Sequence, residues 1–129
     1  MTTGALPAAL LILLPLALEG AFAVEARAEE FARLRGPEIR ALLIGRDLTD
    51  DNHSLEYFRP DGVLIATDPG SGERRQGRWR VQGELLCIAP QAPATAQCFQ
   101  VWRAGSAVSL RRRDQDRPPL AFVREHVGR

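Results

Sequence analysis

The chain has 129 residues, which is enough for one domain and too few for two. Its 17 basic residues nearly balance its 16 acidic residues, and the formal net charge is +1. Nucleic-acid-binding proteins normally have a clear basic excess, so we expect no nucleic-acid partner. The chain contains no lysine, so every basic residue is arginine. This bias fits either a GC-rich coding sequence or a preference for the planar, bidentate arginine head group in anion recognition.

The first 23 residues have the composition of a signal peptide. Residues 5–18 carry no charge and consist mainly of Leu and Ala, and they are too few to cross a bilayer, which takes about 20 apolar residues. Small residues at Ala21 and Ala23 fit signal peptidase and predict cleavage after Ala23, although the leader lacks the usual Lys or Arg near its start. We therefore expect a periplasmic or secreted protein whose membrane contact is at most peripheral.

The chain has two cysteines, Cys87 and Cys98. In an oxidising compartment two cysteines most simply form one disulfide. Their spacing fits neither a C-x-x-C redox motif nor a structural zinc site, which needs four ligands. If Cys87 lies opposite Cys98 in a hairpin, the connecting loop is centred between residues 92 and 93, so the bond and the loop agree. We expect a structural disulfide, no metal and no cofactor.

Two helical patterns precede the rest of the domain. Residues 24–35 form an N-terminal arm rich in Ala, Glu, Arg and Leu, which favours a helix. The segment Gly36-Pro37-Glu38 then begins a second short helix, because proline and an acidic residue suit a first turn. Its apolar face is Ile39, Leu42 and Leu43, and we expect it to end at Gly45 and to cap one end of a core.

After Gly45 the pattern changes to short strand-like runs separated by Gly, Pro and Asp. The predicted strands are Leu55–Arg59, Val63–Thr67, Arg74–Val81, Leu85–Ala89, Cys98–Arg103, Val108–Arg113 and Leu120–Val123. Residues 36–129 are therefore expected to form one mainly β domain. It is an antiparallel meander of six or seven strands forming a small, open or closed, lipocalin-like barrel, preceded by one or two short helices.

These motifs resemble a family of small exported proteins from alphaproteobacteria, in which a short helix leads into a sheet marked by G-x-W-x-V and two cysteines. The residues that carry the resemblance are Gly36-Pro37-Glu38-Ile39, Leu43, Gly45, Tyr57-Phe58, Asp61-Gly62, Gly77-Arg78-Trp79-Arg80-Val81, Leu86-Cys87 and Cys98. The resemblance covers roughly residues 36–110. It implies export, the fold and the disulfide, and it transfers no functional residue because no activity is attached to that family. The acidic segment 46–52 departs from the pattern.

The residues favour a binding protein over an enzyme. The polar run Asp47–His53 lacks the ligand alternation of a calcium loop, so we expect a solvated turn there. A nucleophilic enzyme needs a histidine base, and the two histidines are His53 and His126, the latter so near the C-terminus that fraying is expected. No phosphate-binding loop or G-x-S-x-G elbow is present. We expect no catalytic residue.

Arginine supplies the candidate site. Arg78 and Arg80 share one face of a predicted strand, as do Arg111 and Arg113 of another, so the four form a candidate anion-binding face. The alternative is that they blunt sheet edges and keep the domain soluble. The larger aromatic residues, namely Trp79, Trp102, Phe58, Phe99 and Phe122, are expected in the core, and a small pocket inside the barrel is the other candidate site.

The expected function is thus that of an exported, non-enzymatic β domain that binds a periplasmic protein, an envelope component or a small or anionic ligand. Two alternatives are an inhibitor of a secreted hydrolase and a divergent hydrolase. The first rests on fold analogy alone. The second stays open because paired carboxylates come together in space and cannot be recognised from their spacing in a sequence.

Overall fold

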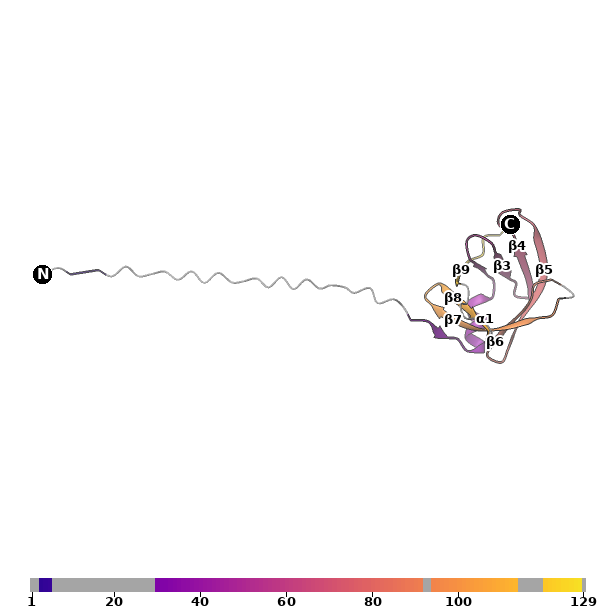
Figure 1. The fold of residues 1–129 in the computed structure, drawn as a ribbon, viewed down its shortest axis with the longest axis horizontal. Helices are drawn as coiled ribbons and strands as arrows, with labels where there is room; N and C mark the ends of the chain where they lie inside the picture. The colour runs from indigo at the N-terminus through magenta and orange to yellow at the C-terminus, as the bar shows by residue number, and fades with distance from the viewer. Residues whose placement is uncertain (1–2, 6–29, 92–93, 114–119, 129) are drawn as a thin grey trace.

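The computed structural model describes residues 3–5, 30–91, 94–113 and 120–128 (Figure 1). The elements in chain order are β1 (Ala32–Arg33), α1 (Gly36–Leu43), β2 (Arg46–Thr49), β3 (Leu55–Phe58), β4 (Val63–Thr67), β5 (Arg74–Gln82), β6 (Leu85–Ala89), β7 (Gln97–Ala104), β8 (Ala107–Arg111) and β9 (Leu120–Glu125). Within these ranges no helix is long and apolar enough to cross a membrane. The predicted signal peptide lies outside the described residues apart from residues 3–5.

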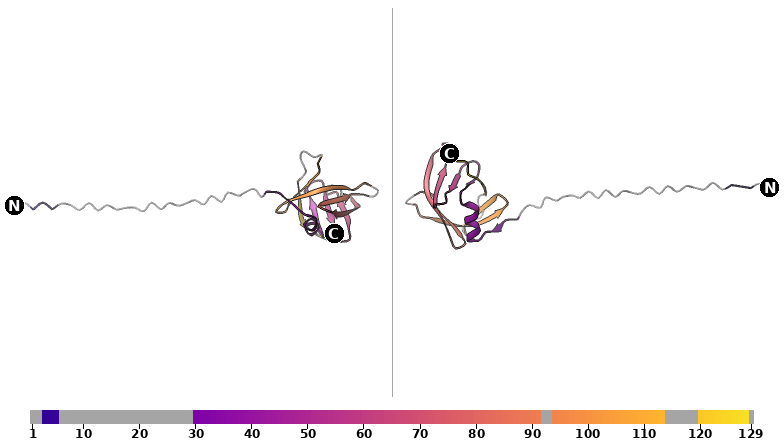
Figure 2. Two further views of the ribbon diagram at one scale, coloured as in Figure 1. Left: turned by 90° about the horizontal axis from the view of Figure 1, so that it is seen from below. Right: turned by 180° about the vertical axis from the view of Figure 1, so that it is seen from behind.

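The sheet is a closed antiparallel barrel. Strands β2 to β7 pair in sequence order, β9 pairs with both β2 and β8, and the pairing of β7 with β8 closes the circle of eight strands. The short strand β1 adds to the outside of this circle by pairing with β7. The predicted antiparallel barrel is therefore confirmed, and Figure 2 shows its curvature from two further sides.

Apolar side chains fill the interior of the barrel. Strand residues alternate between the inner and outer faces, and the inner positions of β2 to β9 supply the core. The most deeply buried members are Phe58, Leu64, Leu86, Val101 and Val108, all 0 % exposed. Of the two possibilities for the barrel interior, a small pocket or a filled core, the buried apolar cluster of the described residues supports the filled core.

Helix α1 covers one end of the barrel, as the sequence predicts. Ile39 and Leu43 are 0 % exposed and join the core cluster. The Glu38 carboxylate accepts a hydrogen bond from the Arg35 backbone N–H at 3.0 Å, which stabilises the first turn. A Cβ at Gly36 would overlap the Gly83 carbonyl oxygen, so glycine lets the β5–β6 turn lie directly against the start of the helix.

The G-x-W-x-V run has a structural explanation on β5. Trp79 lies inside the barrel, contacts Phe58 edge to face at 5.4 Å between ring centroids, and donates its indole N–H to the Arg59 carbonyl at 2.9 Å. Val81 packs against the same core. A Cβ at Gly77 would overlap the Ala89 carbonyl oxygen, so only glycine lets the backbone of residues 89–90 cross β5 there.

The helical prediction for residues 24–35 is wrong for the part that can be checked. Residues 30–35 are not helical, and Ala32–Arg33 pairs with β7 as β1. The Leu34 N–H donates to the Val101 carbonyl at 2.8 Å, and Leu34 is buried. Pairing with β7 and burial of Leu34 outweigh the helix propensity of this segment. Residues 24–29 of the arm lie outside the described ranges.

The solvated turn predicted for residues 47–53 begins later than expected. Arg46–Thr49 is strand β2, which pairs on both sides, with β3 and β9. Asp47 and Thr49 are 7 % and 5 % exposed. Their polar side chains conceal the strand in the sequence, because a strand buried on both faces normally consists of apolar residues. Residues 51–53 are exposed, and Asp51 has a left-handed φ of 69°.

Candidate functional site

The cysteine pair joins two neighbouring strands of the barrel. Cys87 of β6 lies directly opposite Cys98 of β7, and their Sγ atoms are bonded, with 4.0 Å between the Cα atoms. This is the register that the sequence predicts, with Leu86 opposite Phe99 on the adjacent row. The bond lies on the outer face of the sheet, since Leu86 and Ile88 on either side of Cys87 point into the core; Cys87 is nevertheless buried, whereas Cys98 is exposed. A disulfide is compatible with an oxidising, exported location.

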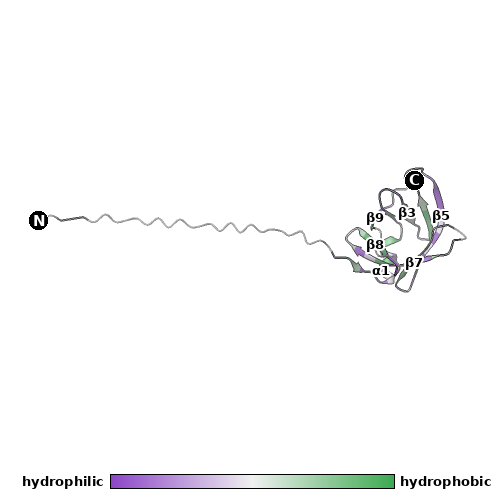
Figure 3. Cartoon of the chain, in the orientation of Figure 1, coloured by the Kyte–Doolittle hydropathy of each residue, from purple (hydrophilic) through white to green (hydrophobic). Residues whose placement is uncertain are grey.

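Arg78 and Arg80 lie on the outer face of β5. Both are exposed and alternate with the inward positions of Gly77, Trp79 and Val81, so their predicted common face is confirmed. Arg80 pairs across the sheet with Cys87, which places its side chain beside the disulfide. Its guanidinium donates to the Gln82 side-chain oxygen at 3.0 Å. Figure 3 colours much of β5 as hydrophilic, in line with this row of outward polar residues.

Arg111 and Arg113 lie two strands away from β6, at the end of β8. Arg111 pairs with Gln100 of β7, so three strand spacings, or about 14 Å, separate it from the β5 row. Its guanidinium lies over the Trp102 ring at 4.4 Å and near the Phe31 ring at 5.8 Å, which makes it half-buried. Arg113 is exposed just beyond β8. The four predicted residues thus share the outer surface without forming one compact cluster.

Ion pairing divides the arginines of the barrel into two groups. On the side of β2, β3 and β9, arginines have carboxylate partners: Arg46 with Glu125 at 3.4 Å, Arg59 with Asp61 at 2.6 Å and Arg124 with Asp51 at 2.6 Å. On β5, by contrast, Arg74, Arg78 and Arg80 have no carboxylate partner among the described residues. The outward positions of β5 to β8 contain no Asp or Glu.

A recess accompanies the unpaired arginines. A cavity of about 780 Å³ lies over β5 and β6, lined by Gln76, Arg78, Arg80, Cys87, Ala89 and Ala94, among others. Its polar side chains are the donor-only guanidinium groups of Arg78 and Arg80 and the Gln76 amide, which both donates and accepts, and none of its lining residues is acidic. This arrangement suits an anion and disfavours a cation.

A larger groove of about 1050 Å³ crosses the outer face of β2 to β5. The C-terminal residues after β9 form one wall, beside β3 and β4 in Figure 1. His126 lies within this wall, where its Nδ1 is 2.8 Å from the Asp47 carboxylate and its ring stacks on Tyr57 with 3.5 Å between centroids. The prediction that His126 frays is therefore wrong, because Asp47 and Tyr57 hold it.

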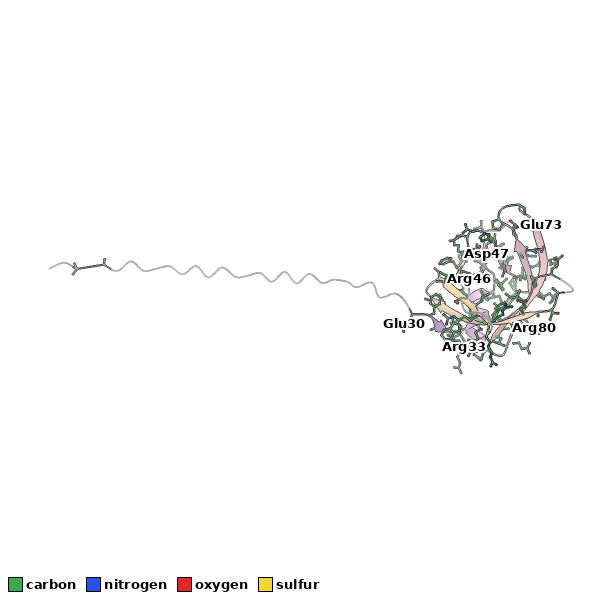
Figure 4. The ribbon with its side chains drawn as sticks, viewed as in Figure 1. Glu30, Arg33, Arg46, Asp47, Glu73 and Arg80 are labelled. Atoms are coloured by element: carbon green, nitrogen blue, oxygen red, sulfur yellow. A yellow bond between two sulfur atoms is a disulfide. The ribbon has the colours of Figure 1, made fainter. Side chains whose placement is uncertain are left out.

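The Asp47–His126 pair has the geometry that orients an imidazole. A carboxylate at Nδ1 fixes the ring and leaves Nε2 as the second polar atom. Among the described residues no Ser, Thr or Cys side chain hydrogen-bonds His126, so a nucleophile is not paired with it there. Sequence reasoning missed the pair because the two residues lie 79 positions apart and Asp47 resembles a turn residue. Figure 4 labels Asp47 and Arg80 in separate parts of the domain.

Two acidic residues near this groove have opposite environments. The Asp50 carboxylate accepts backbone N–H groups of His53, Ser54 and Asn52 at 2.7 to 3.0 Å, which lowers its pKa well below the usual range. Glu56 instead points inward between Leu48 and Ala66 of the neighbouring strands. Burial, with a smaller contribution from the Asp50 charge, raises the pKa of Glu56.

Two of the five aromatic residues expected in the core lie elsewhere. Phe58 and Trp79 are core residues, and Phe99 packs against them. Trp102 occupies an outward position on β7, where it contacts Arg111 and donates its indole N–H to the Gln100 side chain at 3.1 Å. Phe122 is also outward, because its neighbours Ala121 and Val123 pack against the core. Alternation along a strand puts neighbouring residues on opposite faces, but only the register of β7 and β9 in the barrel shows which of the two faces is the inner one.

No cluster of three or more His, Cys, Asp or Glu side chains suited to a metal ion occurs in the described part of the chain. Comparison with protein-family models, with curated proteins and with solved structures found no match to this chain. The resemblance to the exported alphaproteobacterial family therefore stays a prediction.

Proposed function

We propose that this chain is an exported, non-enzymatic binding domain that docks on a phosphate-bearing surface of the cell envelope through the arginines of β5. The observation that carries the proposal is the absence of carboxylate partners for Arg78 and Arg80 within the described residues, while Arg46, Arg59 and Arg124 each have one. The Arg78 guanidinium makes no hydrogen bond within the described residues, and Arg80 donates from Nε and Nη2 to Gln82 only, so both keep N–H donors for an external anion.

The chemistry of this face favours phosphate groups over an acidic protein. Protein interfaces depend on central apolar and aromatic anchors, and the exposed large hydrophobic residues of the described chain, Leu120 and Val127, are not on β5. The outward row of β5, which includes Arg74, Gln76, Arg78 and Arg80, offers charge and hydrogen-bond donors instead. Such a surface suits lipid headgroups, where each arginine near an anionic membrane contributes about 1 kcal/mol.

The test is binding to lipid vesicles by co-sedimentation. Wild-type protein is expected to bind vesicles containing phosphatidylglycerol and not vesicles of phosphatidylcholine alone. The double variant Arg78→Gln/Arg80→Gln loses two contributions of about 1 kcal/mol, so its affinity should fall about 30-fold.

A second variant controls for net charge. Arg40→Gln/Arg59→Gln also removes two exposed arginines, but from helix α1 and the β3–β4 turn. It should bind within about threefold of wild type. Equal losses in both double variants would mean that net charge alone drives binding, and would contradict the proposed face. Saturable capture of an acidic periplasmic protein without vesicle binding would contradict the choice of partner.

A further inference from the structure

The groove over β2 to β5 differs chemically from the arginine face. Its floor consists of the half-buried side chains of Leu55, Tyr57 and Ile65, which point outward from β3 and β4. Outward apolar residues on adjacent strands need a cover, and here the cover is incomplete, because these three side chains line an open cavity of about 1050 Å³. That volume is at the upper end of small-molecule sites.

The acidic residues around the groove are already engaged. Asp47 pairs with His126, and Asp51 pairs with Arg124. Asp68 accepts the backbone N–H groups of Gly70 and Ser71 at 2.8 and 3.1 Å, which lowers the pKa of its carboxyl and keeps it ionised within its own loop. These carboxylates therefore have little capacity left for a cationic ligand.

Arg74 and Arg75 are the two arginines of the groove without a carboxylate partner among the described residues, and Arg74 is the one that shares the outer face of β5 with the apolar floor. It lies on the outer face of β5, directly across from Thr67 at the edge of the apolar floor. The groove thus combines an apolar floor with guanidinium groups that have no carboxylate partner in the described part of the chain, and Thr67 lies directly across from Arg74. An anionic head group over Arg74 with an apolar body over Leu55 and Ile65 satisfies both features.

From this juxtaposition we propose that the groove binds a small amphipathic organic anion, such as a medium-chain carboxylate, with its carboxylate on Arg74. The site is separate from the arginine face of Arg78 and Arg80, and it does not depend on the vesicle-binding proposal. Its C-terminal wall is held by the Arg124–Asp51 pair, the His126–Asp47 pair and the Tyr57 stack, so the boundary of the groove is ordered in the free protein.

Decanoate titrated into ¹⁵N-labelled protein tests the site, with amide shifts recorded by NMR. Saturable binding should move the amides of residues 55–57, 65–67 and 74–76, and those of β7 and β8 should stay in place. Decyltrimethylammonium, which has the same chain and a positive head, should bind at least tenfold more weakly. Equal affinity for the two amphiphiles, or shifts confined to β7 and β8, would overturn the proposal.

A matched pair of variants tests the role assigned to Arg74. Arg74→Glu and Arg80→Glu reverse the charge of two exposed arginines on the same face of the same strand, one in the groove and one outside it. Arg74→Glu should weaken decanoate binding at least tenfold, and Arg80→Glu should leave it within twofold of wild type. Amide spectra of the unliganded variants report whether each is folded. A folded Arg74→Glu variant with wild-type affinity would contradict the assignment.

Discussion

Some positions of this small barrel accept only one type of residue, because the neighbouring backbone leaves no space for a side chain. Gly77 is the clearest case, because the strand backbone at Ala89 and Pro90 occupies the space that a side chain would need. The obstacle is backbone, which cannot move aside as a flexible side chain can.

Gly77→Ala is therefore expected to destabilise the domain by about 3 kcal/mol, in the upper range for overpacked sites. Urea unfolding monitored by tryptophan fluorescence measures this change. Gly128→Ala is the control, because a Cβ there meets open space, and it should unfold like wild type. A loss below about 1 kcal/mol for Gly77→Ala would show that β6 can shift away from β5.

Glu56 is a residue at which polarity and position conflict. It points toward the core, has no hydrogen-bond or ion-pair partner among the described residues, and has a raised pKa because of burial. A raised pKa means that the ionised form is less favourable in the folded state. The neutral Glu56 carboxyl therefore makes its full contribution to stability below the unfolded pKa of about 4.3, and this contribution is lost as pH rises through the folded pKa.

Glu56→Gln should therefore stabilise the domain at pH 7, and this gain should vanish below about pH 4, where wild-type Glu56 is neutral in both states. Asp50→Asn provides a comparison of opposite sign. The Asp50 pKa is lowered, so Asn should destabilise the domain at neutral pH, and this loss should start to shrink only as pH falls below the unfolded pKa of about 4. Urea unfolding from pH 3 to pH 8 measures both. A Glu56→Gln effect independent of pH would contradict the burial argument.

At the residue scale, sequence reasoning was most reliable for residues that follow strand alternation. It assigned Arg78 and Arg80 to one face and Trp79 to the interior, since a period of two fixes both. It was wrong for His126, because its contact with Asp47 joins two ends of the domain. It was also wrong for Trp102, whose outward position depends on which residues of β7 face the core.

At the scale of elements, turns and alternation were sufficient to find seven of the nine strands and α1. The two missed strands have different causes. Strand β1 has only two residues and exists by pairing with β7, so it has no local pattern of its own. Strand β2 carries buried Asp47 and Thr49, whose partners His126 and Ser54 become evident only in the folded chain. Tertiary contacts decide both cases.

The β6–β7 hairpin depends on its disulfide as well as on its backbone ladder. The cysteines are eleven residues apart, so in the chain-entropy description the bond contributes about 2–3 kcal/mol by restricting the unfolded state. Cys87→Ser/Cys98→Ser should lose this amount in urea unfolding, and wild type measured with reductant should lose the same. A reduced wild type that unfolds like the oxidised protein would contradict the entropic contribution.

At the scale of the whole molecule, a closed, filled barrel leaves its outer surface as the place for binding. The core occupies the interior of the described barrel, and the two cavities discussed above lie on its outer face, one over β5 and β6 and the other over β2 to β5. The sequence predicted the barrel because its turns and alternation are local. It did not predict the groove, which four strands and the C-terminal residues form together.

The balanced net charge conceals an uneven distribution. Acidic residues neutralise the arginines around β2, β3 and β9, whereas the outward positions of β5 to β8 carry arginine without acid. A near-neutral total is therefore compatible with a local anion-binding surface, because screening confines electrostatic attraction to about 10 Å at 0.1 M salt. The composition of the chain excludes a protein that is basic overall, but it does not report the charge of a single face such as that of β5 to β8.

The proposal that the β5 arginines bind a phosphate-bearing surface is tested most directly by the salt dependence of binding to phosphatidylglycerol vesicles, measured for wild type and for Arg78→Gln/Arg80→Gln. If the β5 arginines make the contact, wild-type binding should fall steeply between about 0.05 and 0.5 M salt, because the screening length shortens over that range and weakens the attraction between arginine and phosphate. The double variant should bind weakly at low salt and show a shallower dependence. Wild-type binding that is insensitive to salt, or a variant indistinguishable from wild type across the range, would contradict a binding face formed by Arg78 and Arg80.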